Sequence, residues 1–124
     1  MREIKFRYIF TDHIGKSHIL TQDITTIEEG NDVIYNIRHG WELVARCEYT
    51  GLKDKNGVEI YEGDRVRTTK GIVYEIFYTT KTARWAGKTL NVWTDDINTY
   101  FYKALAWLAS RCEICGNIYE HHEL

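Results

Sequence analysis

The sequence predicts a mostly β protein: a small SH3-like or barrel-like antiparallel sheet with one helix before the last strand. Three observations support this fold class. Short segments in which apolar and polar residues alternate, as in half-buried strands, recur along the chain. Residues 54–57 (DKNG) have the composition of a hairpin turn between two such segments. Aromatic residues make up 14% of the composition, which favours strands over a Leu-rich helical bundle.

The first half of the chain is predicted to contain four strands. They cover residues 2–9, 18–24, 41–50 and 58–61. A turn around Gly15 separates the first two strands, and Asn56 and Gly57, which tolerate positive φ, separate the last two. Residues 25–40 fit a helix that starts with a capping box (TTIE), but their apolar residues also alternate as in a strand. We leave this segment open between helix and strand.

The second half is predicted to contain four more strands and the helix. A Gly-Asp bend at residues 62–64 resembles that of small SH3-like barrels at the level of fold. The strands cover residues 65–67, 72–78, 88–93 and 112–120. A loop at residues 79–87 joins the middle two strands. The helix is expected at residues 96–109, because apolar residues from Ile97 to Leu108 recur at helical spacing.

Length and composition indicate a small cytoplasmic protein. The 124 residues fit one domain, residues 1–124, with 44% apolar residues to fill a single core. The N-terminus lacks the apolar region of a secretory signal, and no segment has the length of a membrane span. A net charge of -2 argues against a protein that coats nucleic acid or a membrane surface through its overall charge. Three cysteines, an odd number, do not suggest a disulfide framework.

Three blocks of the sequence resemble the YopX-like family of bacteriophage and prophage proteins. They are residues 1–7 (MREIKFR), 49–64 (YTGLKDKNGVEIYEGD) and 116–120 (GNIYE). The middle block carries most of the resemblance, because it is long and specific in composition and order. The chain departs from the family pattern directly after the first and last blocks. There, Tyr8 and His121 stand in place of the family's usual alanine and asparagine.

The resemblance implies a β-rich, barrel-like fold and a place among the accessory genes of phages and prophages, so we expect the cytoplasm of a bacterial host cell. It implies no catalytic or binding residues. The shared blocks consist largely of turn residues such as Gly51, Gly57 and Gly63, which can adopt backbone angles that a Cβ would obstruct. They are therefore best explained as a folding signature.

One segment carries the main charge asymmetry of the chain. Between residues 65 and 88, six basic residues stand against the single acid Glu75. The residues of interest are Arg65, Arg67, Lys70, Lys81, Arg84 and Lys88, with Trp85 on a predicted loop tip. Cations can meet phosphates while an aromatic ring stacks on unpaired bases, so the segment is a candidate nucleic-acid-binding site. The alternative is a solvated strand face whose aromatic residues point to the core.

Sequence motifs of catalysis and cofactor binding are missing, so we predict no enzyme, no cofactor and no metal site. Cys112 and Cys115 form a CxxC that, with Cys47 and His121 or His122, could supply zinc ligands. On a straight strand, however, positions 112 and 115 face opposite ways, which prevents both from binding one ion. An enzyme whose site is assembled from distant residues remains a lesser alternative.

The predicted helix suggests a different kind of site. Tyr102 and Trp107 lie off its apolar stripe, and exposed aromatic residues are typical of protein interfaces; a wide apolar stripe is the alternative. Our leading prediction is a non-enzymatic accessory protein that binds a host or phage protein, for example in a defence system. We also expect a homo-oligomer, because small β folds expose edge strands. Nucleic-acid binding is the alternative function.

Overall fold

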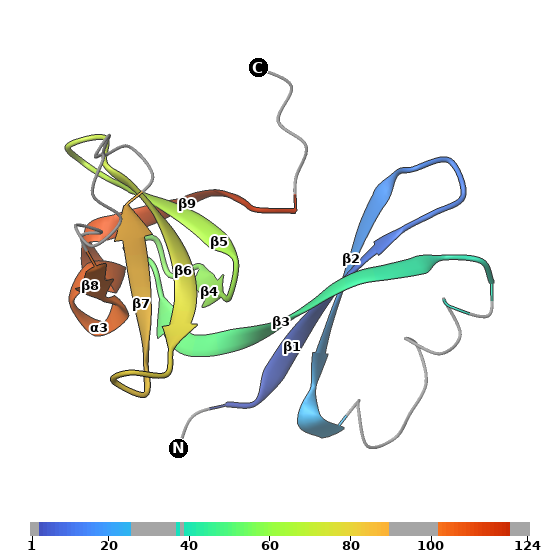
Figure 1. Ribbon diagram of the computed structural model, residues 1–124, viewed down its shortest axis with the longest axis horizontal. Helices are drawn as coiled ribbons and strands as arrows, with labels where there is room; N and C mark the ends of the chain where they lie inside the picture. Colours follow the sequence, from blue (N-terminus) through green and yellow to red (C-terminus); the bar gives the residue numbers. More distant parts are fainter. Residues whose placement is uncertain (1–2, 26–36, 38, 90–101, 120–124) are drawn as a thin grey trace. The chain divides into compact units, whose positions relative to one another are not determined.

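The computed structural model describes residues 3–25, 37, 39–89 and 102–119 (Figure 1). The chain divides into two compact units, Met1–Gly51 and Leu52–Leu124, within the single domain that we predict over residues 1–124. The strands are antiparallel and form two sheets, which confirms the predicted mostly β fold. Both sheets are open, and the described strands form no closed barrel.

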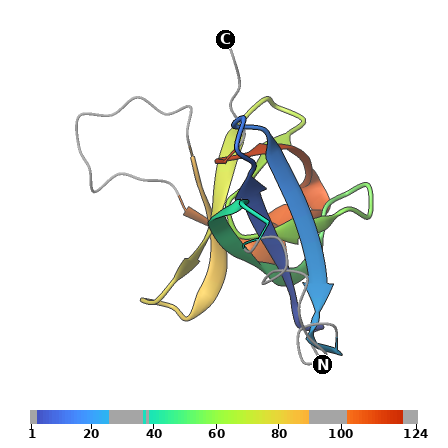
Figure 2. The same cartoon turned by 90° about the vertical axis from the view of Figure 1, so that its right-hand side faces the viewer.

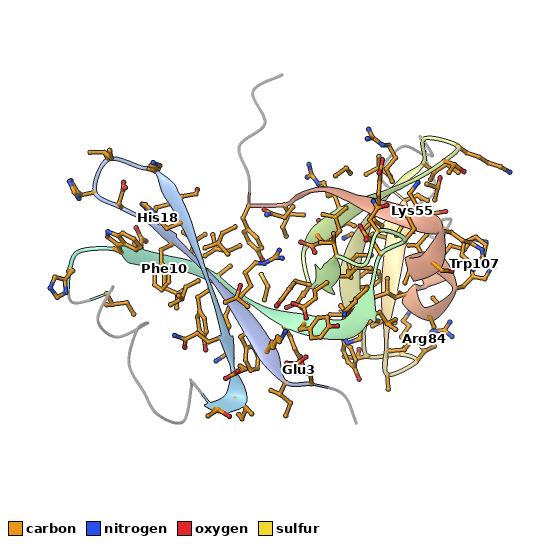
Figure 3. All side chains as sticks on the ribbon, turned by 180° about the vertical axis from the view of Figure 1, so that it is seen from behind. Glu3, Phe10, His18, Lys55, Arg84 and Trp107 are labelled. Atoms are coloured by element: carbon orange, nitrogen blue, oxygen red, sulfur yellow. The ribbon has the colours of Figure 1, made fainter. Side chains whose placement is uncertain are left out.

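The first unit holds an antiparallel ribbon of three strands. They are β1 (Lys5–Thr11), β2 (Ser17–Asp23) and β3 (Glu42–Lys53), which continues into the second unit. The middle strand, β1, carries the apolar residues that fill this ribbon. Phe10 is fully buried and lies opposite His18 of β2 (Figure 3), and its ring centroid is 6.0 Å from that of Trp41. His18 stacks on Trp41 at 4.0 Å, so aromatic contacts hold this end of the ribbon together.

The second unit holds a five-stranded antiparallel sheet and a short helix. The elements are β4 (Glu59–Tyr61), β5 (Asp64–Thr68), β6 (Val73–Thr79), β7 (Arg84–Thr89), β8 (Tyr102–Ala104), α3 (Leu105–Leu108), the 3₁₀ helix η1 (Ala109–Arg111) and β9 (Cys112–Asn117). The sheet has the strand order β8-β7-β6-β5-β9, and the β6–β7 hairpin projects from it (Figure 2). Short β4 instead adds to the sheet of β3.

The core of the second unit lies on one face of the five-stranded sheet. Leu105 and Leu108 of α3 pack against Val66, Tyr74 and Ile76 of β5 and β6, and all five side chains are buried. We call the opposite side of this sheet the outer face. Because side chains alternate along a strand, each residue's position in the register decides which of the two faces it occupies.

The predicted hairpin turn between β3 and β4 is confirmed. The Asp54 N–H donates to the Val58 carbonyl at 2.8 Å, and Gly57 has φ +80°. The buried Asp54 carboxylate accepts three backbone N–H groups: those of Asn56 and Val58 at 2.8 and 3.0 Å, and that of Ile114 at 3.0 Å. Since Ile114 belongs to β9, this one side chain ties the turn to the last strand.

The helix before the last strand is confirmed, but it is shorter than predicted. Of the predicted range 96–109, residues 102–104 form strand β8, and the described helical turns are α3 followed by η1. Ala104 has φ -60° and ψ 135°, an extended conformation. The reason is that β7 offers an open edge: Ala104 lies opposite Ala86 in the ladder, which provides backbone partners without a helical turn. Residues 96–101 lie outside the described residues.

The strand that pairs with β6 begins earlier than predicted. We expected residues 88–93 across a loop at 79–87, but β7 starts at Arg84. A short turn with Ala83 at φ +50° reverses the chain, so the ladder continues to the pair Thr79 and Arg84. Residues 90–93 lie outside the described residues. The other predicted strands are confirmed, with ends that differ by a few residues.

Two further predictions concern segments that the structure describes only in part. The segment 25–40, open between helix and strand, falls mostly on residues 26–36 and 38, outside the described part; Thr25 and Ile37 have helical backbone. The last strand, expected at 112–120, is β9, whose pairing with β5 shifts register near Cys115. No helix among the described residues is long and apolar enough to cross a membrane.

Candidate functional site

Four of the seven residues predicted to bind nucleic acid share the outer face of the five-stranded sheet. Arg65 and Lys88 both lie opposite Glu75 in the register, so the three side chains are on one side. Arg67 is two positions from Arg65, and Arg84 is four positions from Lys88, which places them on the same face. The fold thus brings together cations that are separated by up to 23 positions in the sequence.

Acidic residues of the same face neutralise two of these four cations. Lys88 Nζ is 2.9 Å from Glu75 Oε2, and the Glu75 side chain is largely buried. Arg67 Nη2 is 3.5 Å from Glu113 Oε1, in an exposed pair that contributes little stability. The outer face is therefore less positive than the sequence of residues 65–88 indicates. The pair between Arg67 and Glu113 could not be predicted from the sequence, because Glu113 belongs to the distant strand β9.

Trp85 is not on a loop tip, where the sequence was expected to place it. It lies within β7, on the core side, and packs half-buried against the core cluster. Its ring contacts Tyr78 edge to face, with centroids 5.3 Å apart. The reason is that the β6–β7 turn is short, so residues 84–89 pair with β6 as a strand. Because side chains alternate along a strand, Trp85 points away from the outer face.

Trp107, by contrast, is exposed as predicted. It lies on α3 (Figure 3), and 46% of its surface is accessible to solvent. Two cations lie over its ring: Lys103 Nζ is 5.1 Å and Arg111 Cζ is 4.5 Å from the centroid. The Arg111 guanidinium also donates to the Trp107 carbonyl, which holds it there. Tyr102, the second predicted interface residue, lies in β8, and its side chain is outside the described part.

The exposed tryptophan borders a cavity of about 380 Å³, which we call the Trp107 pocket. Its principal lining residues are Lys70, Ile72, Tyr74, Lys103, Trp107 and Arg111. The described lining therefore combines three cations with three large apolar side chains and contains no acid. Sequence reasoning missed Lys103 and Arg111. Lys103 lies in β8 and Arg111 in η1, so only the fold brings both cations to Trp107.

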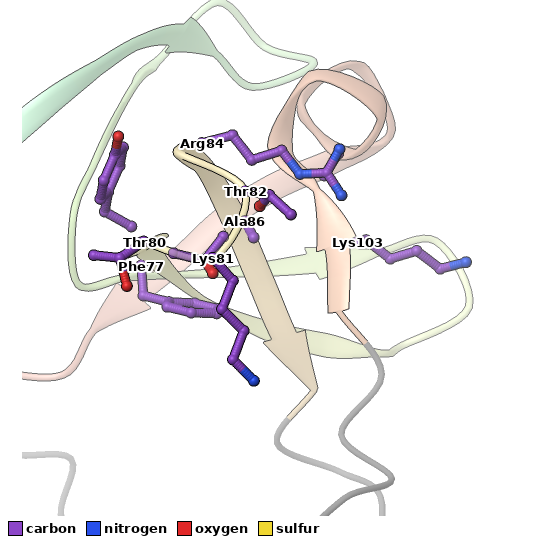
Figure 4. Close-up of a pocket in the computed structure, with 10 residues that line it drawn as sticks. Phe77, Thr80, Lys81, Thr82, Arg84, Ala86 and Lys103 are labelled. Atoms are coloured by element: carbon purple, nitrogen blue, oxygen red, sulfur yellow. The ribbon is translucent and has the colours of Figure 1, made fainter.

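A second cavity, of about 370 Å³, lies at the β6–β7 turn (Figure 4), and we call it the β6–β7 pocket. Its lining includes the cations Lys81, Arg84 and Lys103, the apolar residues Phe77 and Ala86, and threonines of the turn. Lys81 and Arg84 were predicted to bind nucleic acid, whereas Lys103 was not. Lys103 is among the lining residues of both pockets, and its Nζ lies over the Trp107 ring.

The three cysteines are free thiols, and Cys47 and Cys112 are buried. Among the described residues, no group of three His, Cys, Asp or Glu side chains is placed to hold a metal ion. Burial raises the pKa of the Cys112 thiol to about 11, with the nearby Asp54 carboxylate adding to the effect. Cys115 instead donates to the Arg65 carbonyl at 3.4 Å. His121 and His122 lie outside the described part.

An Asp–His pair in the first unit serves the β1–β2 turn. Asp12 Oδ2 is 2.8 Å from His18 Nε2, and Oδ1 accepts the N–H groups of Ile14 and Lys16 at 3.0 and 2.9 Å. The His18 hydrogen bond, more than the backbone bonds, lowers the pKa of Asp12 to about 2. Both carboxylate oxygens are thus used within the turn, which gives the pair a structural role.

Comparison with models of protein families matches residues 7–124 to the family described as YopX protein. The match spans most of both units and includes both pockets of the second unit. No curated protein matches the chain.

Proposed function

The chain belongs to the YopX family, and we propose that it is a non-enzymatic phage or prophage accessory protein that acts in the bacterial cytoplasm by binding another protein. The observation that carries this proposal is the exposed Trp107 with Lys103 and Arg111 over its ring. Tryptophan and arginine are the residues most enriched among those that dominate binding energy at protein interfaces.

The surroundings of Trp107 suit it to this role. An aromatic ring that two cations already hold in place loses little conformational freedom when a partner covers it. Ile72 and Tyr74 supply apolar surface in the adjoining Trp107 pocket, where a partner side chain can be buried. The site therefore offers a preformed anchor with a pocket beside it, the arrangement typical of interface hot spots.

The charges of the Trp107 pocket favour an acidic partner. Lys70, Lys103 and Arg111 line it, and no described lining residue is acidic. An opposite charge on the partner would speed encounter and orient the partner segment. We therefore propose an acidic segment of a host or phage protein, with one apolar side chain, as the occupant. A component of a host process or of a host defence system fits this description.

The Trp107→Ala variant tests the proposal. We expect it to weaken partner binding by about 2 kcal/mol, roughly thirtyfold, because the partner loses its anchor. The measurement is an affinity pull-down from nuclease-treated host lysate, followed by titration of the recovered protein. Val58→Ala, which changes an equally exposed apolar residue in the β3–β4 turn, is the matched control and should bind normally.

Two results would contradict the proposal. One is that the wild-type chain recovers no specific protein after nuclease treatment. The other is that Trp107→Ala binds as tightly as the wild type while both variants remain folded. In either case, neither Trp107 nor its pocket forms a protein-binding site.

We also propose that the chain forms a homo-oligomer through strand β2. This strand ends the order β2-β1-β3-β4, and Ile19 at its middle is 54% exposed although its neighbour Ile9 is buried. Its sequence (SHILTQD) contains no lysine, arginine or proline, the residues that usually protect an edge strand from pairing. A second copy of β2 can pair with this edge.

Ile19→Lys should therefore shift the protein toward the monomer, because it places a charge in the centre of the paired strands. Molar mass from light scattering during size-exclusion chromatography, over a range of concentrations, measures the shift. Val58→Lys, at a similarly exposed position of the second unit, should keep the wild-type mass. A wild-type protein that is monomeric at every concentration rules the oligomer out.

Nucleic-acid binding is the second candidate function, and the shared outer face of Arg65, Arg67, Arg84 and Lys88 favours it. Because Glu75 and Glu113 neutralise two of these cations, binding to the sheet face alone would depend on Arg65 and Arg84. Such contacts would be strongly weakened by salt.

A further inference from the structure

We propose that two copies of strand β2 pair in antiparallel orientation with Leu20 on the two-fold axis, and that the assembly closes as a dimer. The proposal rests on the homo-oligomer proposed above, and it adds the register of the pairing and the number of chains. In this register, each Leu20 lies opposite its own copy, and each Ile19 lies opposite Thr21 of the partner subunit.

The other three edge strands of the two described sheets are unsuited to such pairing. Strands β4 and β8 have three residues each, and the Tyr61 N–H of β4 donates to Asp64 Oδ2 at 2.8 Å. The β3–β4 turn covers β9: the Ile114 N–H donates to Asp54, and the Cys112 carbonyl accepts a backbone N–H of the turn at 3.0 Å. With seven residues, β2 is the longest of the described edge strands.

The β1–β2 turn determines which backbone groups of β2 face the open edge. The Asp12 N–H donates to the Lys16 carbonyl at 3.0 Å, so these two residues form a hydrogen-bonded pair of the ladder. Hydrogen-bonded and non-hydrogen-bonded pairs alternate along an antiparallel ladder. The N–H and C=O groups of Ser17, Ile19 and Thr21 therefore point away from β1.

These outward groups are open to a second strand. Ser17, Ile19 and Thr21 are all exposed, and among the described residues no side chain hydrogen-bonds to their backbone. A row of such groups along an edge is a template for pairing with another chain.

Only certain registers satisfy these groups in two identical strands. Outward groups must face outward groups, so the two-fold axis passes through a residue of β2 and not between two residues. With the axis at Leu20, the middle of Ser17–Asp23, all seven residues are paired. An axis at Ile19 or Thr21 leaves two residues at one end of each strand unpaired, which loses backbone hydrogen bonds.

The side chains also suit an axis at Leu20. Leu20 is half-buried and lies opposite Tyr8 of β1, and its copy extends this apolar row across the axis. The pair of Leu20 residues is non-hydrogen-bonded, the kind of pair in which side chains are closest. Asp23, the one acidic residue of β2, lies opposite Ser17, so no like charges face each other.

Pairing through β2 also determines the number of chains. The same strand of both copies forms the contact, so the interface is isologous and covers the open edge of each copy. At the other end of the described sheet, β4 is short and its Tyr61 N–H is bonded to Asp64. We therefore expect a closed dimer and not an open fibre.

Single cysteines in β2 of the full chain test the register. Directly opposite Cα atoms of antiparallel strands are about 4.5–5.5 Å apart, a distance that a disulfide can span, and only a residue on the axis meets its own copy. Under copper phenanthroline oxidation, Leu20→Cys should form cross-linked dimers on non-reducing electrophoresis at least tenfold faster than Ile19→Cys or Thr21→Cys alone. An equal mixture of the last two variants should also cross-link, because Ile19 lies opposite Thr21.

Two controls accompany these variants. The wild type reports any cross-linking by the three native cysteines, and Val58→Cys, at a similarly exposed position outside β2, reports random collision. Both should remain uncross-linked. The mixture of variants at the exposed positions 19 and 21 keeps the register testable if Leu20→Cys lowers the melting temperature.

The possible results separate the register from the oligomer itself. A light-scattering mass of two chains with cross-linking of Leu20→Cys, and of the mixture, supports the proposal. The same mass with cross-linking of Ile19→Cys alone, of Thr21→Cys alone or of no variant overturns the register but not the homo-oligomer. A mass above two chains overturns the closed dimer, and a monomer at every concentration overturns the homo-oligomer as well.

Discussion

Asp54→Ala is expected to destabilise the Leu52–Leu124 unit by about 3 kcal/mol or more. The substitution removes a carboxylate that accepts three backbone N–H groups, those of Asn56, Val58 and Ile114. Each hydrogen bond to a charged group contributes about 1.5–3 kcal/mol, and donors left without a partner add a desolvation cost. Asp54 is only 6% exposed, so water replaces these bonds poorly.

Urea denaturation of the wild type and the variant measures this difference. Asp54→Asn is the control, because its amide keeps the shape and one oxygen acceptor but presents an NH₂ group to one of the donors. We expect its free energy of unfolding to lie between those of the wild type and Asp54→Ala. An Asp54→Ala protein within about 0.5 kcal/mol of the wild type, the range of ordinary surface substitutions, would show that the bonds contribute little.

Because of the Asp54 carboxylate, the free energy of unfolding should fall at acid pH. Burial alone would raise the pKa of Asp54, but the N–H groups of Ile114, Val58 and Asn56 outweigh it, and the pKa of Asp54 is lowered. A group with a lowered folded pKa stabilises the protein above its unfolded pKa, near 3.8 for Asp. This stability is lost as the pH falls through the folded value. The difference between wild type and Asp54→Ala should therefore narrow below about pH 4.

Gly87→Val should destabilise the second unit by about 3 kcal/mol, the upper range for overpacking a core. Valine is a better strand residue than glycine, so propensity alone predicts the opposite sign. Gly87 lies in β7 on the core side, where an added Cβ would be 2.9 Å from Leu108 Cδ2 and 3.0 Å from Tyr74 Cβ. Leu108 Cδ2 is the end of a side chain and can shift. Tyr74 Cβ is bonded to the backbone of β6 and cannot move away.

A double-mutant cycle with Leu108→Ala tests the cause. Leu108→Ala alone should cost about 3 kcal/mol, because it leaves a cavity under the sheet. Together the two substitutions should cost less than their sum, since the alanine removes the nearer of the two contacts. Strict additivity in the urea midpoints of the four proteins would show that Leu108 is not what excludes a side chain at position 87.

Local chemistry explains why most strands and turns could be predicted. Alternation of apolar and charged residues marks β1 directly, and the DKNG turn needs only Asp54 and a glycine that accepts positive φ. These features act over a few residues, so no knowledge of distant segments is required. The short strand β8 was missed because a segment distant in sequence causes it. Tyr102–Ala104 is extended because it pairs with the open edge of β7, not because of its own sequence.

For the candidate sites, the sequence by itself determined the family resemblance, the stock of cations at residues 65–88 and the aromatic residues worth testing. Only the tertiary structure decided how these are used. The short β6–β7 turn placed Trp85 against the core, whereas α3 left Trp107 exposed between Lys103 and Arg111. The register brought Glu75 to Lys88 and Glu113 to Arg67. The physical reason is that face and pairing depend on contacts between strands, which the order of residues along one strand does not contain.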